Sequence, residues 1–453
     1  MKITLVNPVT IDGTRVLRVE RCQQKIIPTV GNWPPITLLE IAAELKSKED
    51  NDVKIIDGEA EGLTFLRLIE LVASNDPEIA VIHSTTPTIE DDISFAALLK
   101  NKLPDLETVF TGLPATTIPG EILKFGSVDY AVMGEPQDTI RELVECRSNN
   151  IADLSRISGL GYKIDGRVII NKRRAQKETY DYRVFPDRFL IDNDRYRLPL
   201  TGKKFTVIKT SRGCDFSCSF CTSEAYYGRG WRPRSVENIM EEIRQVEREH
   251  GIDNFLFISD TFNGNSEFVK ELSRAIIASG LNIKWVSNSR LDLVDEESVF
   301  LMKESGCVLV SLGIESYDEG VLRKNKKFLK REAIDKGIGL FKKHGILTYG
   351  YFILGLEGET KMSIFKTIIK AALSKLDFAI FYTLTPYPGT EYFNKFVNNK
   401  WKEYFHGISN IVTYRHLSGT EIKAYIYLAS VLFYSKPKRL NSFFKYFLRG
   451  RLL

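Results

Sequence analysis

The sequence predicts an α/β protein with two domains, and three observations lead to this prediction. Short apolar runs alternate with helical patterns through most of the chain. The 453 residues are more than one simple core accommodates. One stretch rich in Asp, Arg, Tyr and Pro interrupts the alternation. We therefore expect a doubly wound, Rossmann-like domain (1–165), a hairpin and crossing segment (166–205), a partial (β/α)6 TIM-type barrel (206–400) and a helical C-terminal region (401–453).

Five apolar segments in the first domain are typical of strands, near residues 2–8, 52–60, 78–88, 107–112 and 128–136. Helical patterns separate them, so we expect an open parallel sheet that binds ligands at the carboxyl ends of its strands. The loops expected there contain small Gly, Ser and Thr residues, which let a large flat ligand approach the backbone. They are residues 7–12, 57–61, 84–88, 112–116 and 134–137.

Two further features limit what the first domain binds. The first strand is not followed by G-x-G-x-x-G, which argues against a nicotinamide cofactor. His83 lies at the end of the third strand, and we interpret it as a histidine packed at the sheet edge rather than a metal ligand.

The crossing segment begins with residues that alternate around Asp165-Gly166, which predicts a hairpin. The residues that follow, 180–199, have no clear period. We expect an ordered segment, because a flexible linker would be rich in Gly and Ser.

Six strand–helix steps follow in the second domain, with strands near residues 205–214, 254–262, 283–294, 307–316, 346–360 and 377–390. Right-handed units of this kind close toward a barrel whose active site lies at the carboxyl ends of the strands. Six steps are fewer than eight, so we expect an incomplete barrel that is open at one side. The polar strand ends are candidate site residues: Asp260, Ser287, Asn288, Arg290, Glu315 and Gly355.

Half of the six cysteines lie in one loop after the first barrel strand, as Cys214, Cys218 and Cys221. Short cysteine spacings hold iron–sulfur clusters, and three ligands leave one iron of a four-iron cluster open to substrate or cofactor. Phe220 would shield the cluster, while Arg212 and the backbone amides of residues 213–217 would stabilise its charge. The alternatives are unrelated buried thiols or a structural zinc, which would require a fourth ligand.

The C-x3-C-x2-C loop, with an aromatic residue before its last cysteine, resembles the radical S-adenosylmethionine (SAM) superfamily. The segments "FISDTF", "SLGIES", "GYFILGLEGET" and "LTPYPGTEYF" extend the resemblance over most of residues 205–395. It implies a [4Fe-4S] cluster whose open iron binds SAM and whose electron cleaves SAM to a 5′-deoxyadenosyl radical. With the polar strand ends, it implies SAM contacts from Phe220, Asp260, Phe262, Ser287, Arg290, Glu315, Ile353 and Gly355.

The first domain resembles the cobalamin-binding subgroup of that superfamily, through "DGEAEG", "STTPTIEDDISFAALLKNKLPDLETVFTG" and "DYAVMGEPQDTI". The resemblance implies cobalamin as a cofactor, held by loops that include Ser84, Thr85, Gly112 and Glu135. Two features depart from the subgroup: D-x-H-x-x-G, which supplies a histidine to cobalt, is absent, and the usual Gly-Gly pair is replaced by "TGL" at 111–113. The alternative is a degenerate domain kept for packing or substrate docking.

Residues 436–453 interleave basic and aromatic side chains, a composition that suits the surface of an anionic membrane. The alternative is a C-terminal helix docked on the barrel with a solvated basic face. This ending also resembles members of the subgroup that act on lipids, hopanoids, archaeal isoprenoid lipids or tetrapyrroles.

We therefore expect an enzyme that methylates an unactivated carbon of a hydrophobic, lipid-like substrate, with electrons from a donor such as ferredoxin or flavodoxin. The alternatives are radical cyclisation or rearrangement without methyl transfer, and a non-catalytic iron–sulfur redox protein. A net charge of +5 is too small to indicate nucleic acid. The sequence has neither a signal peptide nor an apolar run of about 20 residues, and few cysteines, so we expect a cytoplasmic protein with possible peripheral contact to the inner face of the membrane.

Overall fold

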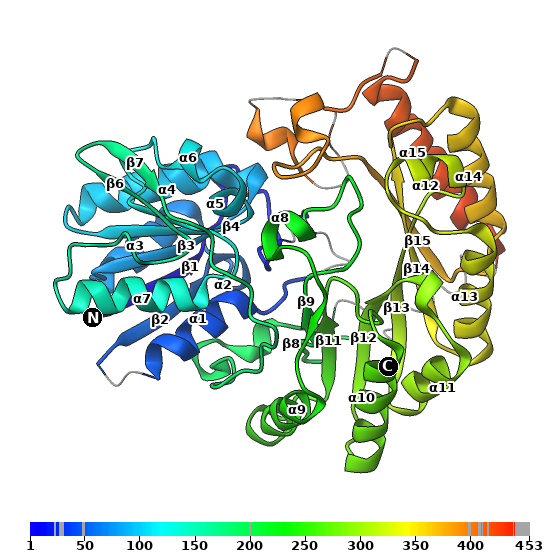
Figure 1. Cartoon of the computed structure of the whole chain (residues 1–453), viewed down its shortest axis with the longest axis horizontal. Helices are drawn as coiled ribbons and strands as arrows, with labels where there is room; N and C mark the ends of the chain where they lie inside the picture. Colours follow the sequence, from blue (N-terminus) through cyan, green and yellow to red (C-terminus); the bar gives the residue numbers. More distant parts are fainter. Residues whose placement is uncertain are drawn as a thin grey trace.

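The computed structural model describes residues 1–21, 24–26, 31–47, 50–198, 201–396, 400–405, 409, 411–414, 416–437 and 439. Two sheets organise these residues, and they lie side by side in Figure 1. A seven-stranded sheet belongs to the N-terminal part of the chain, and a six-stranded parallel sheet belongs to the part that carries the three cysteines. The expected α/β architecture is confirmed.

The first sheet has the strand order β2-β1-β3-β4-β5-β6-β7, and its first five strands are parallel. The strands are β1 (Lys2–Asn7), β2 (Asp52–Asp57), β3 (Ile79–Ser84), β4 (Glu107–Gly112), β5 (Tyr130–Val132), β6 (Leu160–Ile164) and β7 (Arg167–Ile170). The order reverses between β1 and β3, so the carboxyl ends of these two strands form the expected ligand edge.

Helices cover both faces of this sheet because alternate strand residues are apolar on each face. They are α1 (Ile36–Lys46), α2 (Gly58–Glu61), α3 (Phe65–Ser74), α4 (Ile89–Lys102), α5 (Leu113–Thr117), α6 (Pro119–Ile122) and α7 (Gln137–Ser148), with the 3-10 turn η1 (Thr86–Thr88). Residues of α1 and α7 pack in the core of one face, and residues of α3 and α4 pack in the core of the other.

The predicted hairpin is present, and it extends the first sheet. β6 pairs antiparallel with both β5 and β7, and the turn residues Asp165 and Gly166 have φ values of 48° and 76°. The chain then crosses to the second sheet through residues 171–198, which include η2 (Arg188–Leu190) and η3 (Asn193–Arg195). The crossing segment is ordered, as expected.

The second sheet has the order β15-β14-β13-β12-β11-β8 and all its pairs are parallel. Its strands are β8 (Thr206–Lys209), β11 (Asn254–Ile258), β12 (Lys284–Ser289), β13 (Cys307–Glu315), β14 (Leu347–Leu354) and β15 (Phe378–Thr383); the short strands β9 (Ser211–Arg212) and β10 (Arg232–Pro233) pair beside it. Six strands in sequential order form the predicted incomplete barrel.

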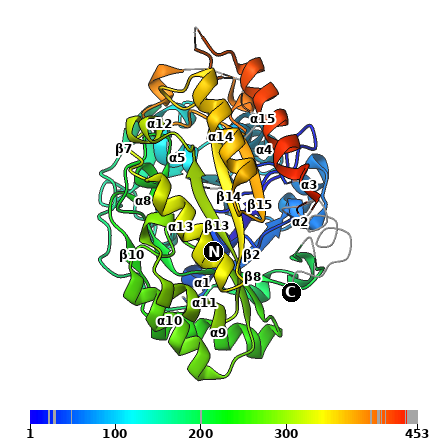
Figure 2. The same cartoon turned by 90° about the vertical axis from the view of Figure 1, so that its right-hand side faces the viewer.

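Most helices of this half lie on the outer side of the curved sheet (Figures 1 and 2), whereas the short helix Ser223–Tyr227 lies between the two sheets and contacts α5 of the first domain. In chain order, the helices of this half are α8 (Ser223–Tyr227), α9 (Val236–His250), α10 (Ser266–Ser279), α11 (Glu296–Glu304), α12 (Glu319–Lys324), α13 (Arg331–Lys343), α14 (Lys361–Leu373) and α15 (Gly419–Tyr434), with the 3-10 turns η4 (Leu291–Leu293), η5 (Phe393–Lys395) and η6 (Trp401–Glu403). Ser235 caps α9 and Gly251 ends it with φ of 61°, as the sequence predicts.

The C-terminal region contains α15, which packs against α14 and β15. The basic and aromatic segment 436–453 lies outside the described residues, apart from 436, 437 and 439. Arg439 does not form a solvated basic face: it is 7% exposed and donates hydrogen bonds to the carbonyls of Ala372 and Ser374 at 2.8 and 2.7 Å. Among the described residues, no helix has both the length and the apolar character needed to cross a bilayer.

Candidate active site

The cysteine loop is fixed at its first turn by Gly213. This residue has φ of 74°, and a Cβ atom there would lie 2.3 Å from the carbonyl oxygen of Gly230, so a larger residue would not fit. The Gly213 N–H donates to Oδ2 of Asp260 at 2.9 Å. The carboxylate at the end of β11 therefore anchors the start of the loop.

The three cysteines of the loop face one cavity of about 380 Å³ at the carboxyl ends of the barrel strands. Each is a free thiol. The Cys214 Sγ lies 3.0 Å from Oγ1 of Thr261, and the backbone N–H of Ser223 points at Sγ of Cys221 from 3.5 Å. All three cysteines line this one cavity, and their role as cluster ligands stays a prediction.

Burial, more than the nearby charges, sets the protonation of two of the three thiols. Burial raises the pKa of the Cys214 thiol, and it raises the pKa of Cys218 to about 11 although the charge of Lys327 acts in the opposite direction. Protonated, buried thiols next to cations are the state expected of cluster ligands that carry no iron.

The structure gives no support to a structural zinc site in the described part of the chain. There, no three His, Cys, Asp or Glu side chains are arranged to hold one metal ion. An iron–sulfur cluster distributes its thiolate ligands over several iron atoms, so its ligands need not converge on one point. The donor set of three thiols fits a cluster.

Several strand ends that the sequence singled out also line the cavity. Asp260 follows β11, Arg290 follows β12, Glu315 ends β13 and Ile353 lies in β14. Asp260 accepts a hydrogen bond from Nε of Arg21 at 2.5 Å, which brings the first domain to the cavity. Arg290, Glu315 and Ile353 come from three separate strands, so only the folded sheet assembles the site.

Arg290 stacks on the cysteine loop. Its guanidinium carbon lies 3.5 Å from the centroid of the Phe216 ring, and its Nη2 pairs with Asp292 at 2.8 Å. The stacking places a positive charge beside the cysteines while its partner aspartate orients it.

Glu315 and Lys327 form a buried ion pair at the cavity wall, with Nζ 2.8 Å from Oε1. Glu315 has φ of 66°, and a Cβ atom on Gly313 would lie 2.8 Å from its carboxylate. Lys327 was not among the predicted site residues, because no pattern in its surrounding sequence marks a buried lysine.

Other cavity residues that sequence reasoning missed come from both domains. Arg21, Gln24 and Trp33 reach it from the first domain, and an aromatic set comes from the barrel: Phe216, Tyr351, Tyr382 and Tyr387. The hydroxyl oxygens of Ser289, Thr383 and Thr385 are buried at the cavity without a hydrogen-bond partner in the described structure. Such oxygens can accept or donate to a polar ligand. Strand alternation places Ser289 on the side of Ser287 and Thr383 on the side of the buried Phe381, so no local pattern indicates that these two hydroxyls reach the cavity.

Three predicted contact residues lie outside the cavity. Phe262 is 0% exposed and packs between Trp285 and Phe257 in the barrel core. Ser287 is buried on the opposite side of β12 from Asn288, because successive strand residues alternate. Gly355 donates its N–H to Oε2 of Glu359 at 2.6 Å. For these three the structure corrects the expectation of a SAM contact from the side chain or strand end.

At the carboxyl edge of the first sheet, the loop side chains Ser84 and Thr85 form hydrogen bonds with residues that follow closely in the chain. Oγ of Ser84 donates to Asp92 at 2.7 Å, and the Thr85 hydroxyl lies 2.7 Å from that of Thr88. A Cβ atom on Gly112 would lie 2.1 Å from the Ser84 carbonyl oxygen. The glycine is required here by the close approach of β3 and β4, whatever ligand lies nearby.

Unpartnered polar atoms nevertheless remain at this edge. Oδ1 of Asn7, both ring nitrogens of His83 and Oγ1 of Thr111 are buried without a hydrogen bond of normal geometry among the described residues. Burial lowers the pKa of His83 to about 3, so the ring is neutral. Buried, uncharged polar atoms that lack a hydrogen-bond partner in the protein are suited to bind the polar tail of a cofactor.

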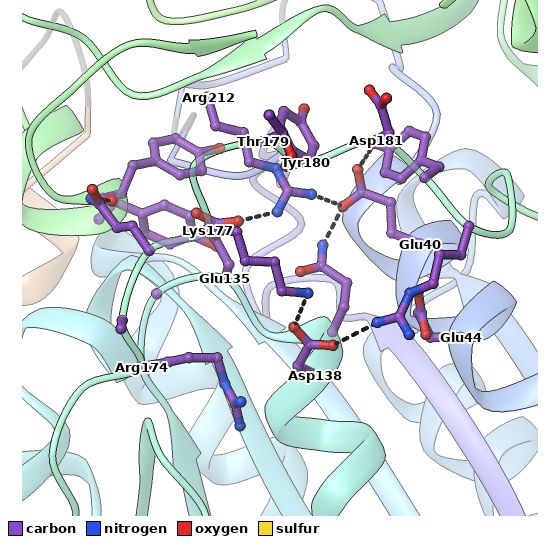
Figure 3. Close-up of a pocket in the computed structure, with 18 of the residues that line it drawn as sticks. Glu40, Glu44, Glu135, Asp138, Arg174, Lys177, Thr179, Tyr180, Asp181 and Arg212 are labelled. Carbon is purple, nitrogen blue, oxygen red and sulfur yellow. Dashed lines mark hydrogen bonds and ion pairs between the residues drawn. The ribbon is translucent and has the colours of Figure 1, made fainter. Parts of the chain in front are cut away.

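Glu135 does not belong to this edge. Its two oxygens pair with Arg212 and Arg232, which lie in β9 and β10 on either side of the cysteine loop. The structure therefore corrects the expectation that Glu135 holds cobalamin, because its carboxylate is engaged with the barrel. Figure 3 shows Arg212 between Glu135 and Glu40.

Glu40 completes this junction, next to a second cavity of about 370 Å³. Its Oε2 lies 2.8 Å from Nζ of Lys209 and 3.3 Å from Nη2 of Arg212. Burial alone would raise the pKa of Glu40, but these two cations hold it below its usual value. The Arg212 guanidinium also lies 4.0 Å from the ring centroid of Tyr180 (Figure 3). The strand that leads into the cysteine loop is thus held by carboxylates of the first domain.

An incomplete parallel barrel, with three cysteines facing a cavity after its first strand, defines the class of radical SAM enzymes. Sequence comparison agrees: the model of the radical SAM superfamily matches residues 208–370, and that of the B12 binding domain matches residues 26–144. An uncharacterized methyltransferase of Pyrococcus horikoshii is 33% identical over 446 residues, which cover 97% of this chain and 93% of the relative. The chain belongs to the radical SAM superfamily, in the group with an N-terminal B12 binding domain, and it is an enzyme.

Two further proteins share this arrangement. The anaerobic magnesium-protoporphyrin IX monomethyl ester cyclase of Rubrivivax gelatinosus is 28% identical over 371 residues, which cover 81% of this chain and 66% of the cyclase. The structure of the radical SAM methyltransferase TsrM from Kitasatospora setae, with cobalamin and a [4Fe-4S] cluster bound, superimposes with a TM-score of 0.70. That match covers 87% of this chain and 74% of TsrM at 16% identity, so it shows a common fold.

Proposed function

We propose that this enzyme methylates an unactivated carbon of a hydrophobic substrate. The observation that carries the proposal is the shared cavity: three thiols and six aromatic side chains, together with polar and charged residues, face the same space between the domains. The relatedness to a methyltransferase over nearly the whole chain supports the reaction type.

Cys214, Cys218 and Cys221 would hold a [4Fe-4S] cluster, and Phe220 would cover it. When bound, the cluster supplies the electron that cleaves SAM. Asp260, by binding the Gly213 N–H, sets the position of the loop. The residues proposed to contact SAM are Arg290, Glu315 and Ile353, with the hydroxyls of Ser289, Thr383 and Thr385.

Asn7, His83 and Thr111 would hold polar groups of cobalamin at the edge of the first sheet. When bound, cobalamin supplies the methyl group. Gly112 would allow the close packing of β3 on β4 beneath it, and Ser84 and Thr85 would support the edge through Asp92 and Thr88.

The cavity wall supports a hydrophobic, lipid-like substrate. Tyr351 stacks on Tyr382 with ring centroids 6.0 Å apart, and Trp33 of the first domain lines the same cavity. Because the first domain supplies part of the wall, it would exclude water from the reacting carbon.

A second candidate reaction is radical cyclisation or rearrangement without methyl transfer, which the relatedness to a cyclase favours. A third is electron transfer by an iron–sulfur protein without SAM cleavage. The two alternatives differ from methylation in their products, so one reconstitution separates all three.

The test is anaerobic reconstitution with iron, sulfide, cobalamin, SAM and dithionite. We expect about four iron atoms per chain, 5′-deoxyadenosine, and the visible spectrum of bound cobalamin. Cys218→Ala should lose the cluster, whereas Cys146→Ala, on α7, should not. An intact cluster that yields no 5′-deoxyadenosine would refute radical chemistry, and SAM cleavage without cobalamin binding would favour cyclisation or rearrangement.

The domain limits, the cellular location, the electron donor and the membrane contact of the enzyme are also proposals. We propose the domain limits 1–165, 166–205, 206–400 and 401–453, and the pairing of β6 with β5 supports counting the hairpin with the first sheet. A cytoplasmic location with ferredoxin or flavodoxin as electron donor suits the oxygen-sensitive chemistry. Residues 436–453 would contact an anionic membrane from that side.

A further inference from the structure

The outer surface of α14 and α15 is unusually apolar. Six large hydrophobic side chains on these two neighbouring helices are exposed. They are Met362 (75% exposed), Phe365 (46%), Leu373 (65%), Tyr427 (74%), Leu428 (39%) and Val431 (65%). We name these six side chains the outer apolar face.

Contacts on the opposite side of the helices define which way this face points. Residues Ile364 and Ile368 of α14 and Phe433 of α15 are buried in the barrel core. The Tyr434 hydroxyl donates to the Ala379 carbonyl of β15 at 2.9 Å. Both helices therefore pack their inner sides on the sheet, and they lie next to each other at the outer edge of the barrel (Figures 1 and 2).

The two helices run in the same direction. Nζ of Lys361 lies 2.5 Å from Oε1 of Glu421, so their N-terminal turns are adjacent. Figure 2 shows both helices on the same side of the molecule.

The two helices and their flanking residues carry an excess of positive charge. Residues 360–376 and 416–437 contain one acidic residue, Glu421, which Lys361 neutralises. Lys366 pairs with Asp318. The remaining lysines form no ion pair with a described residue: Lys370, Lys375, Lys423 and Lys436.

We propose that the outer apolar face docks on the surface of an anionic lipid bilayer. Apolar side chains on a helix pair enter the boundary between headgroups and acyl chains, while lysines at the rim bind anionic headgroups. A second copy of this chain fits less well, because a symmetric contact would bring two sets of unpaired lysines together. A neutral bilayer would leave these lysines without partners.

The choice of a lipid bilayer as the partner rests on the proposed function, because a bilayer would supply the hydrophobic substrate. The face itself is separate from the cavity, on the outer side of β14 and β15. Failure of membrane binding and failure of SAM cleavage are therefore measured independently.

The experiment is vesicle flotation with the reconstituted full-length enzyme. We expect flotation with phosphatidylcholine vesicles that contain phosphatidylglycerol, and little with phosphatidylcholine alone. The variant Phe365→Glu/Val431→Glu should float roughly tenfold less, and Lys370→Gln/Lys423→Gln should float less while losing its salt dependence. The matched control is Ile277→Glu/Phe300→Glu, which changes exposed apolar residues on α10 and α11 and should float as the wild type does.

Thermal melts and 5′-deoxyadenosine production in solution should be equal in all four proteins, which would show that the variants fold. Equal flotation of Phe365→Glu/Val431→Glu and wild type would overturn the proposal. So would a dimer that this variant dissociates, or binding that appears only after residues 440–453 are removed. Complete loss of flotation on that truncation, with the face intact, would assign the contact to the tail alone and would also overturn it.

Discussion

Glu135 illustrates how one side chain joins two domains at the residue scale. Its carboxylate, 23% exposed, lies between Arg212 and Arg232 on both sides of the cysteine loop. Removal of the carboxylate leaves the buried Arg232 without its carboxylate partner and leaves Arg212 with Glu40 alone. A missing partner of this kind costs more than the pair itself contributes.

We therefore expect Glu135→Leu to lower the free energy of unfolding by about 3 kcal/mol, with less iron retained after reconstitution. Thermal unfolding and iron content per chain measure both effects. Glu121→Leu is the control, because Glu121 pairs with Lys124 on the surface. Unfolding and iron content of Glu135→Leu that match the control would contradict the assigned role.

Gly213 supports a second prediction at this scale. An alanine at this position would place Cβ 2.3 Å from the Gly230 carbonyl and would keep a φ that side chains disfavour. We expect Gly213→Ala to reduce cluster content severalfold. Gly202→Ala is a useful control, since Gly202 also has positive φ (67°) but has open space around its Cα. Equal cluster content in the two variants would show that the loop tolerates the displacement.

The sequence predicted the residues that its motifs name but not their partners. Cys214, Cys218 and Cys221 follow from spacing alone. Arg21 could not be found because it reaches the cavity through Asp260, which is distant in sequence, and Lys327 could not be found because no local pattern marks a buried lysine. Phe262 was misplaced because a strand-end aromatic can point to the core as well as to the ligand.

At the element scale, the turn between β14 and α14 contains a carboxyl group with unusual titration. Burial raises the pKa of Glu359 from 4.5 to about 8. The folded protein therefore keeps a proton that the unfolded chain releases. The stability that this bound proton contributes is fully present below about pH 4.5 and is lost as the pH rises through 8.

We expect Glu359→Gln to remove this part of the pH dependence, because the amide oxygen still accepts from the Gly355 and Leu356 amides. Midpoints of thermal unfolding between pH 5 and 8 test it: the fall with pH should be smaller in the variant than in wild type. Glu357→Gln, whose carboxyl has a lowered pKa and titrates below this range, should keep the wild-type slope. A variant with the full wild-type slope would assign the pH dependence to other groups.

The order of the helices and strands was predictable, because the periodic spacing of apolar residues and the helix-capping residues depend only on the local sequence. The strands of both sheets and the helix between Ser235 and Gly251 follow from such patterns. The hairpin was recognised from Asp165-Gly166, but its place as the edge of the first sheet depends on pairing with β5, which no local pattern encodes.

At the scale of the whole molecule, the two domains share one hydrophobic cluster. Val207 of β8 is buried in the cluster formed by the first domain, and Leu256 and Ile258 of β11 pack against it. The barrel strands closest to the first domain therefore depend on it for burial. An isolated barrel would expose these apolar side chains to water.

We expect full-length protein to unfold in one calorimetric transition, and a fragment of residues 203–453 to bind a hydrophobic dye and melt without cooperativity. Calorimetry and dye fluorescence of both proteins check this. A fragment that melts as cooperatively as the full chain would show that the barrel folds independently.

The ion pairs of Lys209 and Arg212 with Glu40 have a consequence for exchanging domains between relatives. A first domain grafted from another member of the superfamily would bring its own side chains to these cations, and a mismatch would leave charge stranded beside the cysteine loop. A successful chimera would carry Glu20, Glu40 and Glu135 together with the graft. The two domains are therefore expected to change together in evolution, because a substitution in one domain constrains which substitutions the other domain can accept.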